Sequence, residues 1–279
     1  MIELERTRRK IDFKKFKNRH AEETDFDELI DEPFTLRENG KLIVALVEPS
    51  QNLEALRQAC KTIKYTKSYR SNGLLTTSRV FGYEPRKTLR KDYCNITSIS
   101  RDHPNQSKIL LKGAQIVSDN YKQINPELHA VHLQMTETKL ADDWKLKDAP
   151  FTSGIVNENN PLKYHFDAGN YKNVWSGMVV FKEGIQGGYL SLPEFRIGLG
   201  LRDKSILYFD GQGILHGVTP IKRLHSNAKR YSIVYYSLQG MWNCLPINDE
   251  VLRIKRLRSE REERRSRNNQ KMPLTPENK

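Results

Sequence analysis

The sequence predicts a mixed α/β protein in which a helical front half supports a double-stranded β-helix (jelly-roll) barrel. Residues 107–121 carry apolar side chains at helical spacing, which predicts an amphipathic helix. From Phe151 onwards, short segments of alternating apolar residues follow one another with turn residues between them, a pattern typical of a sandwich or jelly roll. The predicted strands are residues 151–156, 162–166, 176–181, 189–192, 196–201, 205–209, 214–218 and 231–238.

The front half mixes strands with helices. Ser50 and Asn52 are candidate caps because their side chains can accept hydrogen bonds from the first turn of a helix. The predicted elements are a buried strand at residues 41–48, a helix ending near residue 63, a strand at 74–81, the helix at 107–121 and another from about residue 126. We therefore divide the chain into an N-terminal arm (1–40), an α/β supporting region (41–150), the jelly-roll core (151–245) and a basic helix with a tail (246–279).

Charge is concentrated at the two ends of the chain. The 279 residues include 47 Lys and Arg against 34 Asp and Glu, a formal net charge of +13, which indicates an acidic partner. Residues 6–20 are densely basic with two phenylalanines among them, and residues 251–267 predict a basic helix before a polar tail that we expect to be disordered from residue 268. These ends are either solvated charge or arms that bind phosphates through counterion release, and composition leaves both interpretations open.

Composition excludes several classes of protein. No apolar run approaches the roughly 18 residues of a transmembrane helix, and the N-terminus lacks the apolar stretch of a signal peptide. Cys60, Cys94 and Cys244 are odd in number and widely spaced, so they predict neither a disulfide framework nor a zinc site. We therefore expect a soluble, intracellular protein in a reducing compartment, with no membrane partner.

Three residues of the β-rich half form a candidate metal site. His165 and Asp167 alternate in a predicted strand, so their side chains share one face and can reach one ion. His216 lies 49 residues beyond Asp167, beside a glycine that allows close approach, and is the natural third ligand. Two histidines and one carboxylate are the facial triad of non-haem Fe(II) oxygenases, which leaves positions for a co-substrate and O₂.

A second pair of residues indicates the co-substrate. Arg230 and Ser232 follow His216 by 14 and 16 residues and lie on one face of the last predicted strand. A guanidinium and a hydroxyl together can bind a carboxylate, such as the distal carboxylate of 2-oxoglutarate. The Gly-Gly-x-Leu turn at residues 187–190, between the predicted ligands, is frequent in such barrels.

The sequence resembles the TET/JBP family of nucleic-acid-modifying Fe(II)/2-oxoglutarate dioxygenases. The likeness covers about residues 79–238, and it is most specific at residues 165–170 and 230–232. The compact barrel resembles viral and microbial members, including those of phages, and Arg79-Val-Phe-Gly resembles a segment of JBP-like members. The other segments that carry the resemblance are Phe151-Thr-Ser-Gly, His165-Phe-Asp-Ala-Gly-Asn, Gly187-Gly-Tyr-Leu, Phe209-Asp-Gly-Gln, His216-Gly-Val-Thr-Pro and Arg230-Tyr-Ser.

The resemblance implies a role for each matching residue. His165, Asp167 and His216 would hold Fe(II), while Arg230 and Ser232 would bind 2-oxoglutarate.

Three further residues are expected to contact substrate. Asn170 matches the family's Asn that contacts the target base, and Tyr236 matches the aromatic residue that stacks on it. Arg79 is expected to contact substrate or co-substrate. The sequence departs from the TET pattern at Leu238, where members of that group have a base-contacting histidine.

The resemblance further implies a reaction, in which Fe(II), 2-oxoglutarate and O₂ oxidise the methyl group of 5-methylcytosine in DNA to 5-hydroxymethylcytosine. The expected partner is double-stranded DNA with a flipped 5-methylpyrimidine, bound by a monomer in the host cytoplasm if the protein is viral or in the nucleus if it is eukaryotic. Thymine hydroxylation to 5-hydroxymethyluracil, and hydroxylation of a protein or small molecule on the same fold, are the alternatives. A third possibility is a DNA-binding module without catalysis, against which the intact metal set argues.

Overall fold

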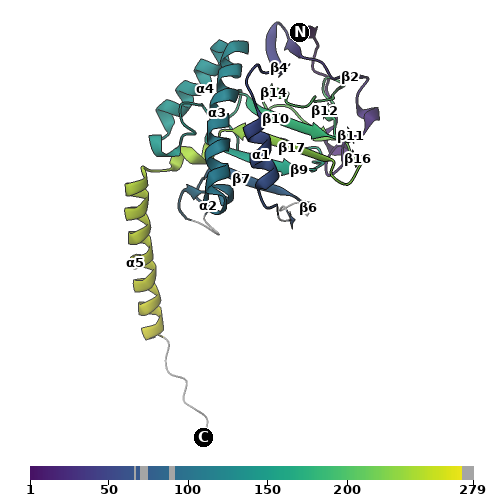
Figure 1. The fold of residues 1–279 in the computed structure, drawn as a ribbon. Helices are drawn as coiled ribbons and strands as arrows, with labels where there is room; N and C mark the ends of the chain where they lie inside the picture. Colours follow the sequence, from purple (N-terminus) through teal and green to yellow (C-terminus); the bar gives the residue numbers. More distant parts are fainter. Residues whose placement is uncertain (66, 70–74, 88–91, 272–279) are drawn as a thin grey trace.

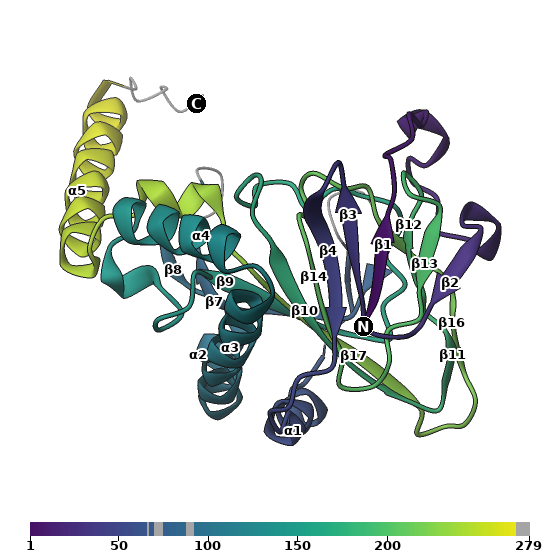
Figure 2. The same cartoon turned by 90° about the horizontal axis from the view of Figure 1, so that it is seen from above.

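The structure, a computed structural model, describes residues 1–65, 67–69, 75–87 and 92–271. Two β-sheets face each other across an apolar interior, and helices cover the outer face of the larger sheet (Figure 1 and Figure 2). This arrangement is the mixed α/β jelly roll that the sequence predicts, and it confirms the fold class. Within the described residues, no helix is both long and apolar enough to cross a membrane.

The larger sheet forms one wall of the barrel and the smaller sheet closes it. In order across the larger sheet lie β1 (Ile2–Glu5), β3 (Phe34–Glu38), β4 (Lys41–Val47), β14 (Ile206–Phe209), β10 (Ser176–Glu183), β17 (Lys229–Tyr236), β9 (Ser153–Glu158), β7 (Ser78–Glu84) and β8 (Asn95–Ile96). The smaller sheet contains β15 (Gly217–Val218), β12 (Leu190–Leu192), β13 (Ile197–Leu199) and β2 (Glu28–Ile30). Two short pairs are β11 (Ile185–Gly187) with β16 (Ile221–Arg223), and β5 (Ser68–Tyr69) with β6 (Leu75–Thr76). Residues 1–40 thus contribute three strands to the two sheets.

An asparagine or a proline marks the start of three of the described helices. The Asn52 side chain accepts a hydrogen bond of 2.8 Å from the Glu54 N–H at the start of α1, and Asn125 caps α4. The α-helices are α1 (Glu54–Thr62), α2 (Ser98–Asp102), α3 (Pro104–Ile124), α4 (Pro126–Lys139) and α5 (Ile247–Lys271). Short 3₁₀ segments are η1 (Phe13–Lys15), η2 (Glu23–Asp25), η3 (Asp142–Trp144) and η4 (Gln239–Asn243). Helices α1 and α3 pack their apolar faces on the larger sheet, which stiffens the strands behind the site.

Period-two alternation along β17 separates a packing face from a polar interior face. Ile233 and Tyr235 point toward the helices and belong to the core that α1 and α3 share with the sheet. Arg230 and Ser232 therefore point to the other side, into the barrel. The register pairs Ser232 with Val180 of β10 and with Asn157 of β9, so the polar face is flanked by two long strands.

Three expectations about secondary structure need correction. Residues 162–166 do not form a strand; a single β-bridge between His165 and His216 replaces it, because the chain there follows an irregular path across the barrel mouth. Helix α5 continues through Lys271, so residues 268–271 are helical, and the remainder of the predicted tail, residues 272–279, lies outside the described residues. The first residue of the strand predicted at 74–81 is also outside them, and β6 and β7 replace that single strand.

The expectation about the cysteines was wrong for two of the three. Cys94 and Cys244 form a disulfide across a sequence separation of 150 residues, in a small apolar cluster with Leu140, Trp144 and Met241. Spacing along the chain gives no sign of a pair that only the fold brings together. Cys60 is a buried free thiol, and burial raises its pKa to about 12.

Helix α5 is tied to the body near its beginning and then projects away from it (Figure 1). The buried Glu250 carboxylate forms an ion pair with Arg86 and accepts a hydrogen bond from the Cys94 N–H. Arg253 and Arg261 contact Asp92, one through its carbonyl oxygen and the other through its carboxylate. The helix is therefore held to the body between Glu250 and Arg261, close to the disulfide.

Candidate active site

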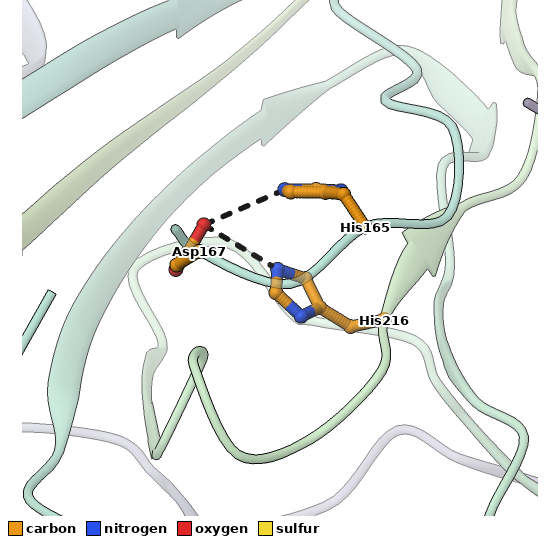
Figure 3. Close-up of side chains that lie close together, drawn as sticks. All are labelled: His165, Asp167 and His216. Carbon is orange, nitrogen blue, oxygen red and sulfur yellow. Dashed lines mark ion pairs between the residues drawn. The ribbon is translucent and has the colours of Figure 1, made fainter. Parts of the chain in front are cut away.

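Two neighbouring stretches of backbone bring His165, Asp167 and His216 together at the mouth of the barrel (Figure 3). The backbone N–H groups of His165 and His216 each donate to the other's carbonyl oxygen, over 2.9 and 3.2 Å. The Asp167 N–H donates to the Gly211 carbonyl oxygen over 2.8 Å. One ligand atom from each of the three side chains lies within 4.8 Å of the others, and the structure thus confirms that the predicted residues converge.

Backbone carbonyl groups fix the tautomer of both histidines. The Nδ1 atoms lie 2.7 Å from the Lys163 oxygen and 3.0 Å from the Ile214 oxygen. Because a carbonyl oxygen only accepts, each Nδ1 carries the proton and each Nε2 keeps its lone pair. The Nε2 atoms of His165 and His216 face Asp167 Oδ1 at 3.5 and 3.9 Å, which leaves two imidazole lone pairs and a carboxylate directed at one point.

This donor set fits a divalent transition metal. Burial, together with the neighbouring His165, lowers the pKa of His216 to about 4, so its imidazole is neutral at pH 7, the form that binds metals. Two imidazoles and one carboxylate with open positions are the facial arrangement suited to Fe(II). The hydrogen bonds at Nδ1 are the outer contacts that hold metal-binding histidines in place.

Gly211 and Asn170 lie against the Asp167 carboxylate, whereas the sequence indicated Asn170 only as a contact for the target base. A Cβ at Gly211 would overlap Asp167 Oδ2, so this position admits no side chain while Asp167 keeps its place. Asn170 is buried, and its Nδ2 lies 3.5 Å from the same oxygen and 3.4 Å from Ser176 Oγ. The Asp-Gly pair directly after a predicted strand was the available signal for Gly211.

The three residues open into a cavity of about 410 Å³ that β17 lines along its interior face. Period two places five side chains from this strand and its end in the wall: Arg230, Ser232, Val234, Tyr236 and Leu238. The prediction that Arg230, Ser232 and Tyr236 share a face is confirmed. Tyr236 and Leu238 lie beyond Val234 toward Asn170, whose backbone forms a bridge with Leu238.

Arg230 is the strongest electrostatic feature of the cavity. Its side chain is 2% exposed, and burial lowers its pKa to about 10, so it stays cationic at neutral pH. Its NH2 atom is buried without a hydrogen-bond partner, and among the described residues no carboxylate forms an ion pair with it. A buried guanidinium nitrogen without a partner destabilises the folded protein unless a bound anion accepts its hydrogen bond.

Neighbouring groups shape a carboxylate site around Arg230. Gly188, at φ +68°, passes the Arg230 side chain so closely that a Cβ would lie 3.2 Å from Arg230 Cδ. The Ser232 hydroxyl accepts a hydrogen bond of 3.2 Å from Asn157 Nδ2, so its own proton remains available to a ligand oxygen. Asn157 is in turn fixed by Ser78, whose Oγ donates to its Oδ1 over 2.6 Å. Asn157 was not singled out from the sequence, which gives no sign of this pairing between strands.

The expectation that Arg79 contacts substrate or co-substrate is not supported. Its guanidinium binds Asp102 at 2.7 Å, Ser98 at 3.2 Å and the Lys64 carbonyl oxygen at 2.9 Å. It does not line the cavity, because the outward side of β7 directs it to α2. Arg79 thus ties a helix to the edge of the sheet.

Comparison with known proteins decides the family. The Tet_JBP description, an oxygenase domain of the 2OGFeDO superfamily, matches residues 78–239, more than half of the chain. The chain belongs to the Tet_JBP family. The predicted resemblance is thereby confirmed, and the chain contains a dioxygenase domain of the Fe(II)- and 2-oxoglutarate-dependent class, an oxidoreductase.

The relatives are distant, and two of them are longer proteins. Thymine dioxygenase JBP1 of Trypanosoma brucei brucei is 23% identical over 192 residues, 68% of this chain and 22% of that protein. The bifunctional helicase and thymine dioxygenase JBP2 of the same organism is 23% identical over 236 residues, 80% of this chain and 21% of that protein. This Tet_JBP chain thus spans about a fifth of their length. A solved structure of NgTET1 in complex with 5mC DNA superimposes with a TM-score of 0.57 at 15% identity, covering 86% of this chain and 89% of that one, which shows a shared fold.

Proposed function

We propose that this protein is an Fe(II)/2-oxoglutarate dioxygenase that oxidises the methyl group of 5-methylcytosine in double-stranded DNA to 5-hydroxymethylcytosine. The observation that carries the proposal is the unpaired, buried Arg230 guanidinium in the same cavity as the His165, Asp167 and His216 donor set. A 2-oxo acid would bind the metal through its keto-acid end and supply the missing anion to the guanidinium through its distal carboxylate.

In the proposed mechanism the side chains bind, orient and exclude water. His165, Asp167 and His216 would hold Fe(II), which together with 2-oxoglutarate and O₂ supplies the oxidising power to hydroxylate a C–H bond. Arg230 and Ser232 fix the distal carboxylate of the co-substrate through a charged and a neutral hydrogen bond.

The base has to leave the helix to reach the cavity. Its methyl group cannot approach a buried metal while stacked, so the nucleotide is flipped into the cavity, where Tyr236 offers a ring for stacking. The apolar wall formed by Val234 and Leu238 keeps water from the reacting carbon.

The orientation of Asn170 supports cytosine over thymine if its Oδ1 faces position 4 of the flipped base, as we propose. Asp167 Oδ2 only accepts hydrogen bonds, so the amide has to direct its Nδ2 at the carboxylate. The Oδ1 atom of Asn170 then remains as an acceptor for a base. The 4-amino group of 5-methylcytosine is a donor, whereas thymine has an acceptor oxygen at that position.

Thymine is the alternative substrate, favoured by one observation. The curated relatives JBP1 and JBP2 are named thymine dioxygenases, whereas NgTET1 is described with 5mC DNA. A protein or small-molecule substrate is the remaining alternative, because a barrel of this type does not define its substrate.

The experiment uses purified protein with Fe(II), 2-oxoglutarate and one of three duplexes. The first duplex contains 5-methylcytosine. The second contains thymine and only unmodified cytosine, and the third has uracil in place of every thymine. Nucleosides are quantified by mass spectrometry and succinate is measured in parallel. We expect 5-hydroxymethylcytosine from the first duplex, and no product from any duplex with the Asp167→Ala variant. 5-Hydroxymethyluracil from the second duplex would establish the thymine alternative. Succinate formed only with peptide pools would exclude a DNA substrate.

The proposal includes the arrangement of the whole chain. Residues 151–245 would form the catalytic core, residues 41–150 its support, and the terminal regions, 1–40 and 246–279, would contact the DNA backbone. We infer a monomer that acts wherever the DNA is, in a host cytoplasm or a nucleus.

A further inference from the structure

Part of the N-terminal arm is packed on the rim of the active-site cavity. The Phe16 ring meets the Tyr164 ring edge-on at 4.9 Å, and the Arg19 guanidinium lies over both rings at 5.2 and 5.5 Å. The Tyr164 N–H donates to the Arg19 carbonyl oxygen, and the Tyr164 hydroxyl contacts Asp25 and Ser191. This anchor fixes the segment around η1 beside His165, although the segment lies outside the family match at residues 78–239.

The anchored segment places an exposed aromatic pair at the cavity. Phe166, between two of the ligands, lines the cavity and is 37% exposed, while Phe13 of η1 is 49% exposed. Their rings meet edge-on with centroids 5.5 Å apart. The other eight phenylalanines of the chain are buried or half-buried, so the two that are exposed are the two that contact each other at this polar site.

Positive charge surrounds this pair. Lys14, Lys15 and Lys17 follow Phe13 along the arm and are exposed, and Lys163 lies in the cavity wall. Among the described residues, none of these four lysines forms an ion pair with a carboxylate, in contrast to Arg19 and most arginines of α5. Lysines without ion-pair partners can bind phosphates, and an exposed pair of phenylalanines can insert between stacked bases. A nucleic-acid duplex offers both, with phosphates outside and stacked bases inside.

We propose that Phe13 and Phe166 form an aromatic wedge that enters the base stack of duplex DNA and fills the gap left by the extruded base. Lys14, Lys15 and Lys17 bind the flanking phosphates. This inference rests on the proposed DNA substrate and assigns the opening of the duplex to a segment outside the matched oxygenase domain. Because unstacking costs a few kcal/mol per step, an apolar side chain that occupies the gap shifts the equilibrium toward the flipped base.

The test compares Phe13→Ala with wild type on one target sequence presented as a duplex and as a single strand, whose base needs no extrusion. We expect kcat/KM on the duplex to fall about tenfold and kcat/KM on the single strand to stay within about twofold. A duplex with a mismatch at the target base should restore most of the loss. Phe13→Tyr keeps a ring at this position and should act like wild type. The matched control is Leu224→Ala, which removes an apolar side chain that is 61% exposed and, unlike Phe13, has no ring contact with the cavity residue Phe166.

A second measurement does not depend on oxidation. With 2-aminopurine at the target position, its fluorescence rises when wild-type protein flips it, and Phe13→Ala should reduce that rise at saturating protein. If Phe13→Ala reduces the rise but wild type oxidises no base, the proposed function fails and the wedge stands. An equal rise with Phe13→Ala and with wild type overturns the wedge. The wedge is overturned if Phe13→Ala loses kcat/KM equally on the duplex and on the single strand, or loses none on the duplex. Either result leaves the proposed function intact.

Discussion

Replacing Arg230 by methionine should stabilise the protein without its co-substrate and weaken its response to 2-oxoglutarate. The lowering of the Arg230 pKa from 12.5 to about 10 corresponds to about 3 kcal/mol of unfavourable free energy for the charged guanidinium in the folded state. This cost is fully present at pH 7, because the group is protonated in both the folded and the unfolded chain below the folded pKa. A methionine of similar length removes the charge and keeps the packing.

The gain in stability should be matched by a loss of ligand binding. A charge-assisted hydrogen bond to a carboxylate is worth about 1.5–3 kcal/mol, so the affinity for 2-oxoglutarate should fall by roughly tenfold to a hundredfold. Arg230→Lys should recover part of it, since an ammonium keeps the charge but not the planar fork.

The assay is urea denaturation at fixed pH, with and without 2-oxoglutarate and with Mn(II) in place of Fe(II) so that no turnover occurs. Wild type should gain about 2.7 kcal/mol of unfolding free energy at a hundredfold excess of 2-oxoglutarate over its Kd. Arg230→Met should start from a higher value and gain only about 0.4–1.4 kcal/mol at the same concentration of 2-oxoglutarate. Arg223→Met, on the exposed β16, should behave as wild type. An Arg230→Met protein that is less stable without ligand and responds to 2-oxoglutarate as strongly as wild type would refute the reasoning.

Three further outcomes are expected. Asp167→Ala should abolish turnover and reduce Mn(II) binding measured by electron paramagnetic resonance, with an unchanged circular dichroism spectrum; retained turnover would remove Asp167 from the metal site. Gly211→Ala should weaken metal binding, because its Cβ displaces the Asp167 carboxylate, yet leave DNA affinity unchanged in a binding titration. Reduction of the Cys94–Cys244 disulfide, or the double serine variant, should lower the unfolding free energy by about 5 kcal/mol from the 150-residue separation, and a melting temperature unaffected by reductant would contradict this.

The sequence was most informative along β17, where successive side chains alternate between the two faces of the strand. Arg230, Ser232 and Tyr236 were placed on one face because a strand leaves only two faces, and the structure puts all three in the cavity wall. His165 and Asp167 were predicted on a strand that does not exist, but their convergence with His216 is correct. A local pattern thus identified three side chains that converge, while the bridge that positions them could only be seen in the fold.

What the sequence did not reveal depends on contacts between distant segments. The disulfide joins Cys94 to Cys244, and no spacing rule connects residues so far apart. Arg79 lies in a motif that resembles the family, yet Asp102 of α2 holds its guanidinium away from the cavity. The docking of Phe16 on Tyr164 was equally hidden, since a basic segment with two phenylalanines is compatible with a solvated arm or with a packed one.

The structure also separates the two basic regions that composition treated alike. In α5, Arg253, Arg256 and Arg267 form ion pairs with glutamates of the same helix, and Arg261 pairs with Asp92, so much of its charge is already neutralised. The lysines around η1 have no such partners among the described residues. Phosphate binding should therefore depend more on the arm than on the helix.

Salt dependence of duplex binding distinguishes the two regions. Deleting residues 259–279 removes six basic and four acidic side chains, a net charge of +2, and should make the slope of log affinity against log salt shallower by at most about two. The triple variant Lys14→Ala, Lys15→Ala, Lys17→Ala should make it shallower by nearly three, at about 0.9 per phosphate contact. Neither change should alter base preference, because phosphate contacts carry no sequence information. A larger effect of the deletion than of the triple variant would move the main DNA contact to α5 and leave the N-terminal arm without a role in phosphate binding.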